Sequence, residues 1–352
     1  MQIASRRGKA LAFAQRHLDG YGDFLNATVD DLAVAPNVTR DVRPAFTPRW
    51  QLNGLVRYQI PEPILDGRVS LQLDGATQTM SYIVLKEKVR LRVSISGQGP
   101  TVILVHGWKM SHRAWDRSLY ALSKHFRVVA YDLRGMGESD KPDFGYTFEQ
   151  YADDLFELIK TLEITDATLV GWSMGCSVAL SYMQRHASGV SRLCLINGPV
   201  KLVNGDGFNY GLPPETLEHV LDNLATHWPE CERGFVQKVF FHSYPEHVDW
   251  FTRIALQTPL HVALAIVAAQ ARLDQRPVIA ALDVPVLAMY GRHDPYYPVT
   301  LGDWIASTAT DGQALIFEES AHCPPVEETN RFVSALTDFV YQTPARELSR
   351  SR

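Results

Sequence analysis

Short apolar runs recur along the chain from residue 101 onward and alternate with longer amphipathic segments. The runs are TVILVHG (101–107), FRVVAYD (126–132), ATLVGWS (167–173), VSRLCLING (190–198), VPVLAMYG (284–291) and QALIFEES (313–320). Runs this short and this rich in valine, isoleucine and leucine are typical of strands buried on both faces. Segments between them, such as FEQYADDLFELIKTL (148–162), have the spacing of helices. The alternation predicts an α/β fold: a mostly parallel, twisted sheet with helices on both faces.

A different pattern precedes these runs. Val69, Leu71 and Leu73 alternate with polar residues, and MSYIVLKEKVRLRVSI (80–95) has two alternating halves joined near Glu87. Such alternation is typical of half-buried strands, so we expect an antiparallel edge on the sheet. The rest of residues 1–77 has no repeating pattern and contains five prolines. After one helix, this range is predicted to form an extended N-terminal arm of unknown role.

The alternation of strands and helices is interrupted between Gly198 and Pro277. Helix-length segments follow one another there without a convincing strand, at 213–227, 231–241, 246–257 and 260–273. An all-helical insertion between parallel strands is expected at their carboxyl ends, where ligands bind in such folds. We therefore expect four parts: the arm 1–77, an α/β core over 78–199 and 278–343, a helical cap over 200–277, and a C-terminal tail over 344–352.

Composition and charge narrow the possible functions. Apolar residues make up 46% of the 352 residues and charged residues 21%, which is ordinary globular usage. The formal charge is −5 with both signs interspersed, so nothing resembles the basic stripe of a nucleic-acid-binding protein. Cys176, Cys194, Cys231 and Cys323 lack the spacing of a zinc site or a disulfide framework. We expect no nucleic-acid partner, no metal and no cofactor.

The N-terminal segment bears on localisation. Its apolar run, ALAFA (10–14), is too short for a signal-peptide core, and no stretch approaches the ~20 apolar residues of a membrane span. A cytoplasmic protein without a transmembrane segment is predicted. Two roles stay open for a weakly amphipathic basic helix here: contact with a membrane surface, or packing on the body of the protein. The arm is also a candidate for contacts within a homo-oligomer.

The run at 167–173 leads into the pentapeptide Gly171-Trp172-Ser173-Met174-Gly175. A strand, this sequence and then a helix predict a tight turn whose serine projects above the sheet. Glycine two places either side of the serine lets neighbouring backbone pass close to the turn. Ser173 is therefore a candidate nucleophile, against the alternative of an ordinary serine in a glycine-rich turn.

A nucleophilic serine needs two further groups. Its hydroxyl requires a base within hydrogen-bond reach, and a carboxylate must orient that base. Asp294 follows the run at 284–291, and His322 follows the run at 313–320. Both residues are thus predicted just past a strand, in the order Ser, Asp, His, with room for the cap between Ser173 and Asp294.

Taken together, five motifs resemble those of the α/β-hydrolase-fold serine hydrolases over about residues 80–342. They are His106-Gly107-Trp108, Asp132-Leu133-Arg134-Gly135-Met136-Gly137-Glu138-Ser139, the serine pentapeptide, YGRHDPYYP (290–298) and ESAHCPP (319–325). The resemblance implies a catalytic triad of Ser173, His322 and Asp294. It also implies that the backbone N–H groups of Trp108 and Met174 form the oxyanion hole.

Other residues compete for these roles. Asp132 also follows a strand, but the resemblance places the acid after the later strand. His106 is expected to organise a buried loop, and nothing in the family pattern falls on His293. Cys323 directly follows the candidate base, but adjacent side chains point apart. Cys176 stands where relatives commonly have glycine and is expected only to tune helix packing.

The cap supplies aromatic residues that could line an acyl or aryl pocket. Trp172, Tyr210, Trp228 and Trp250 are the candidates. Similar motifs occur in carboxylesterases, in cofactor-free haloperoxidase-like or perhydrolase enzymes and in C–C bond hydrolases, and the triad does not separate them. Hydrolysis of a small-molecule carboxylic ester is the broadest prediction. The alternative from another class is a non-catalytic binding module of the same fold.

Overall fold

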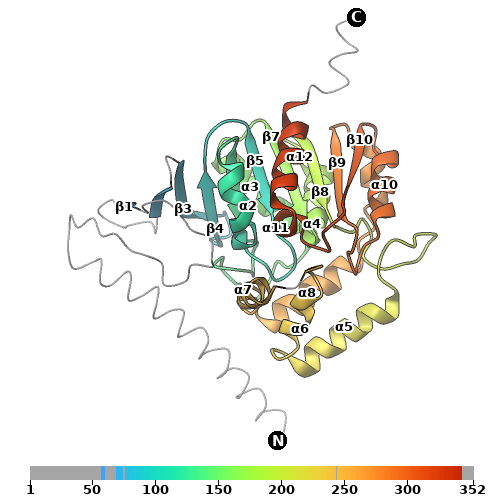
Figure 1. The fold of residues 1–352 in the computed structure, drawn as a ribbon. Helices are drawn as coiled ribbons and strands as arrows, with labels where there is room; N and C mark the ends of the chain where they lie inside the picture. The colour runs from blue at the N-terminus through green and yellow to red at the C-terminus, as the bar shows by residue number, and fades with distance from the viewer. Residues whose placement is uncertain (1–56, 60–68, 74–75, 243, 343–352) are drawn as a thin grey trace, which may run out of the picture.

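A ten-stranded sheet forms the centre of the part of the chain that the computed structural model describes, residues 57–59, 69–73, 76–242 and 244–342 (Figure 1). Its strands are β1 (Arg57–Gln59), β2 (Val69–Leu73), β3 (Ala76–Val84), β4 (Arg90–Ser96), β5 (Thr101–Val105), β6 (Arg127–Tyr131), β7 (Ala167–Trp172), β8 (Val190–Ile196), β9 (Val286–Gly291) and β10 (Gly312–Phe317). The order across the sheet is β1-β2-β3-β4-β6-β5-β7-β8-β9-β10. Strands β1 to β4 and the β4–β6 pair run antiparallel, and the other pairs are parallel. The predicted α/β architecture is confirmed.

The antiparallel edge begins earlier than the arm's predicted end. Strands β1 and β2 and the first two residues of β3 fall within 1–77. Strand β2 pairs with β3, with Val69 opposite Met80 and Leu73 opposite Ala76. The sheet extends into this range because the alternating segment at 69–73 is a strand. The predictions for the N-terminal helix, the arm's oligomer contacts and the C-terminal tail lie outside the described residues.

The interior parallel strands β5 to β9 are apolar because each of them faces two cores. In β5, Ile103 and Val105 pack into the core on one face of the sheet, whereas Val102 and Leu104 pack into the core on the other. A strand covered on both faces has no position at which a polar side chain reaches water. This is the physical origin of the unbroken apolar runs in the sequence.

Helices cover both faces of the sheet. They are η1 (His112–Trp115), α2 (Asp116–Leu122), α3 (Phe148–Thr161), α4 (Met174–Arg185), α9 (Arg276–Ala281), α10 (Val299–Thr308), α11 (Pro324–Glu327) and α12 (Thr329–Tyr341). One core joins the sheet to α3, α4, α9 and α10, and the second joins it to α2, α11 and α12. The sheet is thus the middle layer of three.

The segment between β8 and α9, which the sequence predicts to be the helical cap and which is called the cap below, contains four described helices. Its helices are α5 (Pro214–His227), α6 (Glu232–Gln237), α7 (Pro245–Ala255) and α8 (Leu260–Gln270). In Figure 1 they lie together below the sheet, at one end of its strands. Among the described helices, no single one is long and apolar enough to span a membrane; α7 and α8 meet that measure only as a pair, which is bent by 91°.

Candidate active site

Ser173 occupies the sharp turn between β7 and α4. Its backbone has φ 56° and ψ −121°, a left-handed conformation that is costly for a residue with a side chain. The flanking glycines make the turn possible: a Cβ on Gly171 would lie 2.6 Å from the carbonyl oxygen of Gly175, and one on Gly175 would overlap the carbonyl oxygen of Val105. Close packing of α4 against β7 and β5 thus fixes the position of the serine.

Three side chains form a continuous hydrogen-bonded chain at this turn. His322 Nε2 lies 2.8 Å from Ser173 Oγ, and His322 Nδ1 lies 2.9 Å from Asp294 Oδ2. The Asp294 side chain is fully buried and that of His322 is 7% exposed. With the Nδ1 proton donated to Asp294, Nε2 is free to accept the serine proton. The geometry is therefore that of a nucleophile, a base and an orienting carboxylate.

A fourth residue, Asn197, holds the carboxylate in place. It follows β8, is fully buried and has φ 45°. Its Nδ2 donates hydrogen bonds to Asp294 Oδ2 and, at 3.1 Å, to the carbonyl oxygen of Ala321, while its Oδ1 accepts from the Gly291 N–H at 3.0 Å. Asn197 therefore ties the loops that carry Asp294 and His322 to each other.

Further contacts fix the loops after β9 and β10. The Tyr296 N–H donates to Asp294 Oδ1 at 2.8 Å, and the Trp172 indole donates to the carbonyl oxygen of His322 at 2.7 Å. Glu327 in α11 accepts a hydrogen bond of 2.9 Å from the Ala321 N–H. The imidazole is thus positioned from both sides of its loop before any substrate enters.

The two residues proposed for the oxyanion hole lie beside the serine. Met174 is the first residue of α4, and an N–H in the first turn of a helix has no acceptor within that helix. Gly107 brings the loop of Trp108 close, since a Cβ on Gly107 would lie 3.1 Å from the Cβ of Ser173. Trp108, Ser173 and Met174 line the same cavity.

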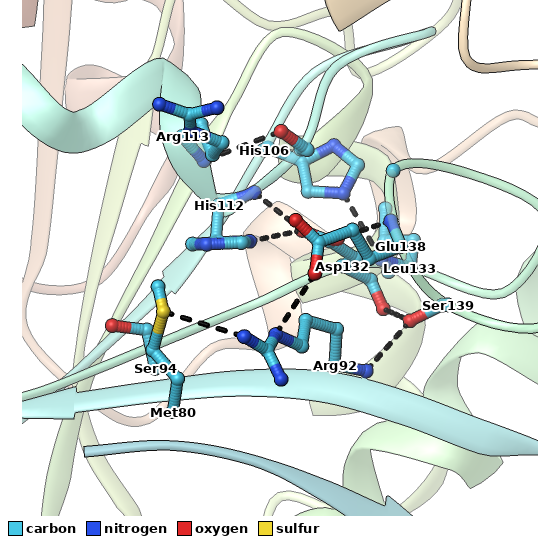
Figure 2. Close-up of polar contacts among 12 residues, drawn as sticks. Met80, Arg92, Ser94, His106, His112, Arg113, Asp132, Leu133, Glu138 and Ser139 are labelled. Atoms are coloured by element: carbon cyan, nitrogen blue, oxygen red, sulfur yellow. Dashed lines mark hydrogen bonds and ion pairs between the residues drawn. The ribbon is translucent and has the colours of Figure 1, made fainter. Parts of the chain in front are cut away.

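The competing histidine and aspartate have other partners. His106 is buried; its Nδ1 donates to the carbonyl oxygen of Gly107 at 2.8 Å and its Nε2 accepts from the Leu133 N–H at 3.0 Å. Burial lowers its pKa to about 4, so it stays neutral. Figure 2 shows Asp132 in the same region, where its Oδ1 accepts from the backbone N–H and Nδ1 of His112, both at 2.6 Å. Both side chains are occupied in organising the loops after β5 and β6.

The side chains of the remaining competitors also have other surroundings. The exposed ring of His293 stacks on Phe241 at a centroid distance of 3.7 Å. Cys323 is buried, and burial raises the pKa of its thiol. Cys176 is buried behind the turn, where its thiol donates to the Gly171 carbonyl oxygen at 3.1 Å; Gly198 provides the space, because a Cβ there would overlap the sulfur.

A mostly apolar cavity of about 90 Å³ opens onto Ser173 and His322. Leu217, Phe235 and Phe251 of the cap form part of its wall. Of the four aromatic residues predicted for the pocket, only Trp172 is among the described residues that line this cavity.

The other three aromatic residues lie elsewhere, and each has a different partner. Tyr210 packs against Phe208, and Trp228 lies beside the Lys109 amine. Trp250 stacks under the guanidinium of Arg113.

Within the described residues, no group of three or more histidine, cysteine or acidic side chains could hold a metal ion.

Comparison with known proteins places this geometry in a family. The family model described as alpha/beta hydrolase fold matches residues 100–329. The chain is 29% identical to the AB hydrolase superfamily protein YisY of Bacillus subtilis, over 73% of this chain and 98% of that protein. It is 30% identical to a pimeloyl-[acyl-carrier protein] methyl ester esterase of Vibrio cholerae, over 70% and 96%. Among solved structures, an esterase from Exiguobacterium antarcticum superposes with a TM-score of 0.71 at 27% identity, over 74% and 99%.

Proposed function

The chain belongs to the α/β-hydrolase-fold family, and from this premise we propose that it cleaves a carboxylic ester through an acyl-enzyme on Ser173. The observation that carries the proposal is the hydrogen-bonded chain from Ser173 Oγ through His322 to Asp294, with distances of 2.8 and 2.9 Å. The similarity to esterases over nearly their whole length supports the ester as substrate.

The first half of the mechanism acylates the serine. Ser173 Oγ attacks the acyl carbon while His322 Nε2 takes the hydroxyl proton, and Asp294 stabilises the imidazolium that forms. The N–H groups of Trp108 and Met174 donate to the developing oxyanion. When the tetrahedral intermediate collapses, the bond from the acyl carbon to the alcohol oxygen breaks and His322 protonates the leaving alcohol.

The second half releases the acid. A water molecule gives a proton to His322 Nε2 and attacks the acyl carbon from the side that the alcohol has left. Collapse of the second intermediate breaks the bond to Ser173 Oγ, which recovers its proton from His322. The small, mostly apolar cavity supports a small apolar acyl or alkoxy group as the part of the substrate held beside the serine.

Two other reactions that use the same triad remain as alternatives to ester hydrolysis. The chain is 28% identical to the non-heme chloroperoxidase CPO-A1 of Kitasatospora aureofaciens, over 64% of this chain and 86% of that protein, which supports a perhydrolase-like reaction as one alternative. In that reaction hydrogen peroxide would replace water as the group that attacks the acyl-enzyme. A C–C bond hydrolase is the other alternative, and a panel of esters, with and without peroxide, together with a vinylogous diketone would separate the three.

The experiment that tests the proposal removes the nucleophile. We expect Ser173→Ala to lower kcat for aryl and alkyl esters by about 10⁶-fold and to abolish labelling by a fluorophosphonate probe. Ser188, an exposed serine in the loop after the same helix α4, provides a matched control, and Ser188→Ala should react normally. Esterase activity retained by purified Ser173→Ala would refute the mechanism. Failure of the unchanged protein to react with the probe would favour the binding module.

A further inference from the structure

A buried lysine directly follows one of the two proposed oxyanion donors. Lys109 is next to Trp108, its side chain is completely buried, and its backbone has φ 59°. A left-handed conformation is unfavourable for a lysine, and burial of its amine is unfavourable unless the charge is compensated. Both the positive φ and the buried amine of Lys109 must therefore be compensated by contacts elsewhere in the protein.

The compensation comes from the cap. Lys109 Nζ lies 2.6 Å from Glu232 Oε2 of α6, and both side chains are 0% exposed. The amine also lies 4.1 Å from the ring centroid of Trp108 and 4.4 Å from that of Phe235. The ring of Trp228 is also near, at 5.6 Å, so the ammonium is held among three aromatic rings and a carboxylate by a charge-assisted hydrogen bond and cation–π contacts.

Trp108 itself is attached to the cap at two further points. Its indole Nε1 donates to the carbonyl oxygen of Ala263 in α8 at 3.1 Å, and its ring meets that of Phe235 in α6 edge-on at 5.7 Å. The short loop that presents the Trp108 N–H to the reacting oxygen is therefore fastened to two cap helices. A displacement of α6 is therefore expected to move this loop as well.

A contribution to folding stability does not by itself explain the buried ion pair of Lys109 and Glu232. A buried ion pair can often be replaced by apolar residues of similar volume with no loss of stability, because desolvation of the two charges offsets their attraction. What the pair offers beyond an apolar contact is direction: the short hydrogen bond is satisfied only when the amine and carboxylate meet in one arrangement. A directional bond beside the oxyanion hole fixes the loop there.

We propose that Lys109 and Glu232 are positioning residues that set the Trp108 N–H against the oxyanion and so couple the placement of the cap to transition-state stabilisation. The inference rests on the proposed serine-hydrolase function. It assigns a role to α6 beyond that of a pocket wall: substrates bind under the cap, and the same contact that seats the cap completes the oxyanion hole. Neither residue touches the reacting atoms.

The test breaks the pair without changing its shape. In Glu232→Gln and Lys109→Met we expect kcat for a good ester substrate to fall by about 10- to 100-fold, less than the loss of a whole oxyanion donor, with KM nearly unchanged. Phenylboronic acid forms a tetrahedral adduct when Ser173 Oγ bonds to boron, and its affinity should fall by the same factor as kcat. Binding of the free carboxylic acid product, which forms no such adduct, should not change.

Two controls distinguish a role in placing the Trp108 N–H from a role that only holds the cap on the core. Arg233 and Asp249 form an ion pair between α6 and α7, half-exposed at 54% and 50%. An exposed pair contributes little, so Asp249→Asn should leave both readouts unchanged. The double variant Lys109→Met with Glu232→Leu replaces the charges by an apolar contact and should regain stability but not kcat. The proposal is overturned if the single variants lower only the melting temperature, or if kcat returns with stability in the double variant. Failure of the serine-hydrolase assignment would appear separately, as activity retained by Ser173→Ala.

Discussion

At the scale of single residues, we expect Asn197 to determine how well Asp294 can orient His322. It supplies a side-chain donor to the buried carboxylate and a bond of 3.1 Å to the loop of the histidine. We expect Asn197→Ala to lower kcat/KM by about 10- to 100-fold, since a hydrogen bond to a buried charge contributes about 1.5–3 kcal/mol. Ester hydrolysis measured beside Ser173→Ala would give the scale of the effect.

A second asparagine provides the control for this substitution. Asn204 lies in the cap loop, where its Oδ1 accepts from the Gly211 N–H at 2.8 Å and makes no contact with the triad. Asn204→Ala should therefore leave kcat/KM unchanged. Equal losses in the two variants would show that Asn197 acts through general stability and not through Asp294.

His106 gives the protein a pH dependence that can be isolated. Burial lowers its pKa from the ordinary 6.5 to about 4 in the folded protein. As the pH falls from 6.5 toward 4, the unfolded chain binds a proton at this imidazole and the folded chain does not, so the free energy of unfolding decreases. The two pKa values imply a loss of about 3 kcal/mol over this range.

The pH effect is tested by comparing slopes. In His106→Asn the contribution of this imidazole disappears, so the free energy of unfolding should fall less steeply between pH 6.5 and 4 than in the unchanged protein. Urea titrations at several pH values would measure both slopes, and Asp132 and His112 are present in both proteins. Parallel slopes would contradict the assignment of a neutral, buried His106.

The sequence anticipates the three residues of the proposed triad better than the residues that support them. Ser173, Asp294 and His322 each follow an apolar run within a recognisable motif, so their positions relative to strands can be read from the chain. Asn197 stands 97 residues from Asp294 in a segment with no distinctive motif, and it meets the carboxylate only because β8 and β9 are neighbours in the sheet. Only the φ of 45° at a non-glycine residue marks it, and that is a property of the fold.

At the scale of elements, the junction of β7 and α4 tolerates no extra atom on its inner side. A Cβ on Gly175 would overlap the carbonyl oxygen of Val105 in β5. We expect Gly175→Ala to push α4 away from the sheet, to destabilise the protein by about 1–3 kcal/mol or more, and to reduce ester hydrolysis because Ser173 moves with the helix. Thermal unfolding and kcat measured on the same sample would report both effects.

A glycine in the cap provides the control for Gly175→Ala, because it has free space around its Cα. Gly234 lies in α6, and a Cβ there would have no atom within 4 Å. Alanine is favoured over glycine within a helix by about 1 kcal/mol, so Gly234→Ala should be neutral or stabilising. If both glycine variants lost activity alike, the close approach at Gly175 would not be the reason.

The elements themselves are largely readable from the sequence, but their contacts are not. Strands β5 to β9 each lie within a predicted apolar run, because burial on both faces leaves a continuous signal, and β10 begins one residue before its run. The sequence also predicts the cap helices, yet two of the tryptophans proposed for the pocket lie elsewhere: Trp228 beside Lys109, and Trp250 under Arg113. A helical pattern shows that a face is buried, but not which neighbour covers it, and in an insertion the neighbour is set by tertiary packing.

At the scale of the whole molecule, the site draws on distant parts of the chain but on no described residue before β5. The cavity-lining residues in the described part of the chain all fall in the range from Gly107 to His322. The antiparallel strands β1 to β4 extend the sheet away from the site beyond β6. Their contribution is therefore expected in stability and solubility and not in catalysis.

Two N-terminal deletions separate these contributions. Removal of residues 1–56 leaves all ten strands of the described sheet, so kcat/KM and the melting temperature should be unchanged. A lower mass in solution would assign oligomer contacts to the deleted segment.

Removal of residues 1–75 also takes away β1 and β2 and exposes the backbone of β3, which pairs with β2 along Ala76–Met80. An unpaired edge strand promotes association, so this variant should aggregate at high concentration while kcat/KM at low concentration is retained. Light scattering and ester hydrolysis over a concentration series would measure both, and a loss of kcat/KM in a folded 1–56 deletion would show that the N-terminal segment contributes to the site.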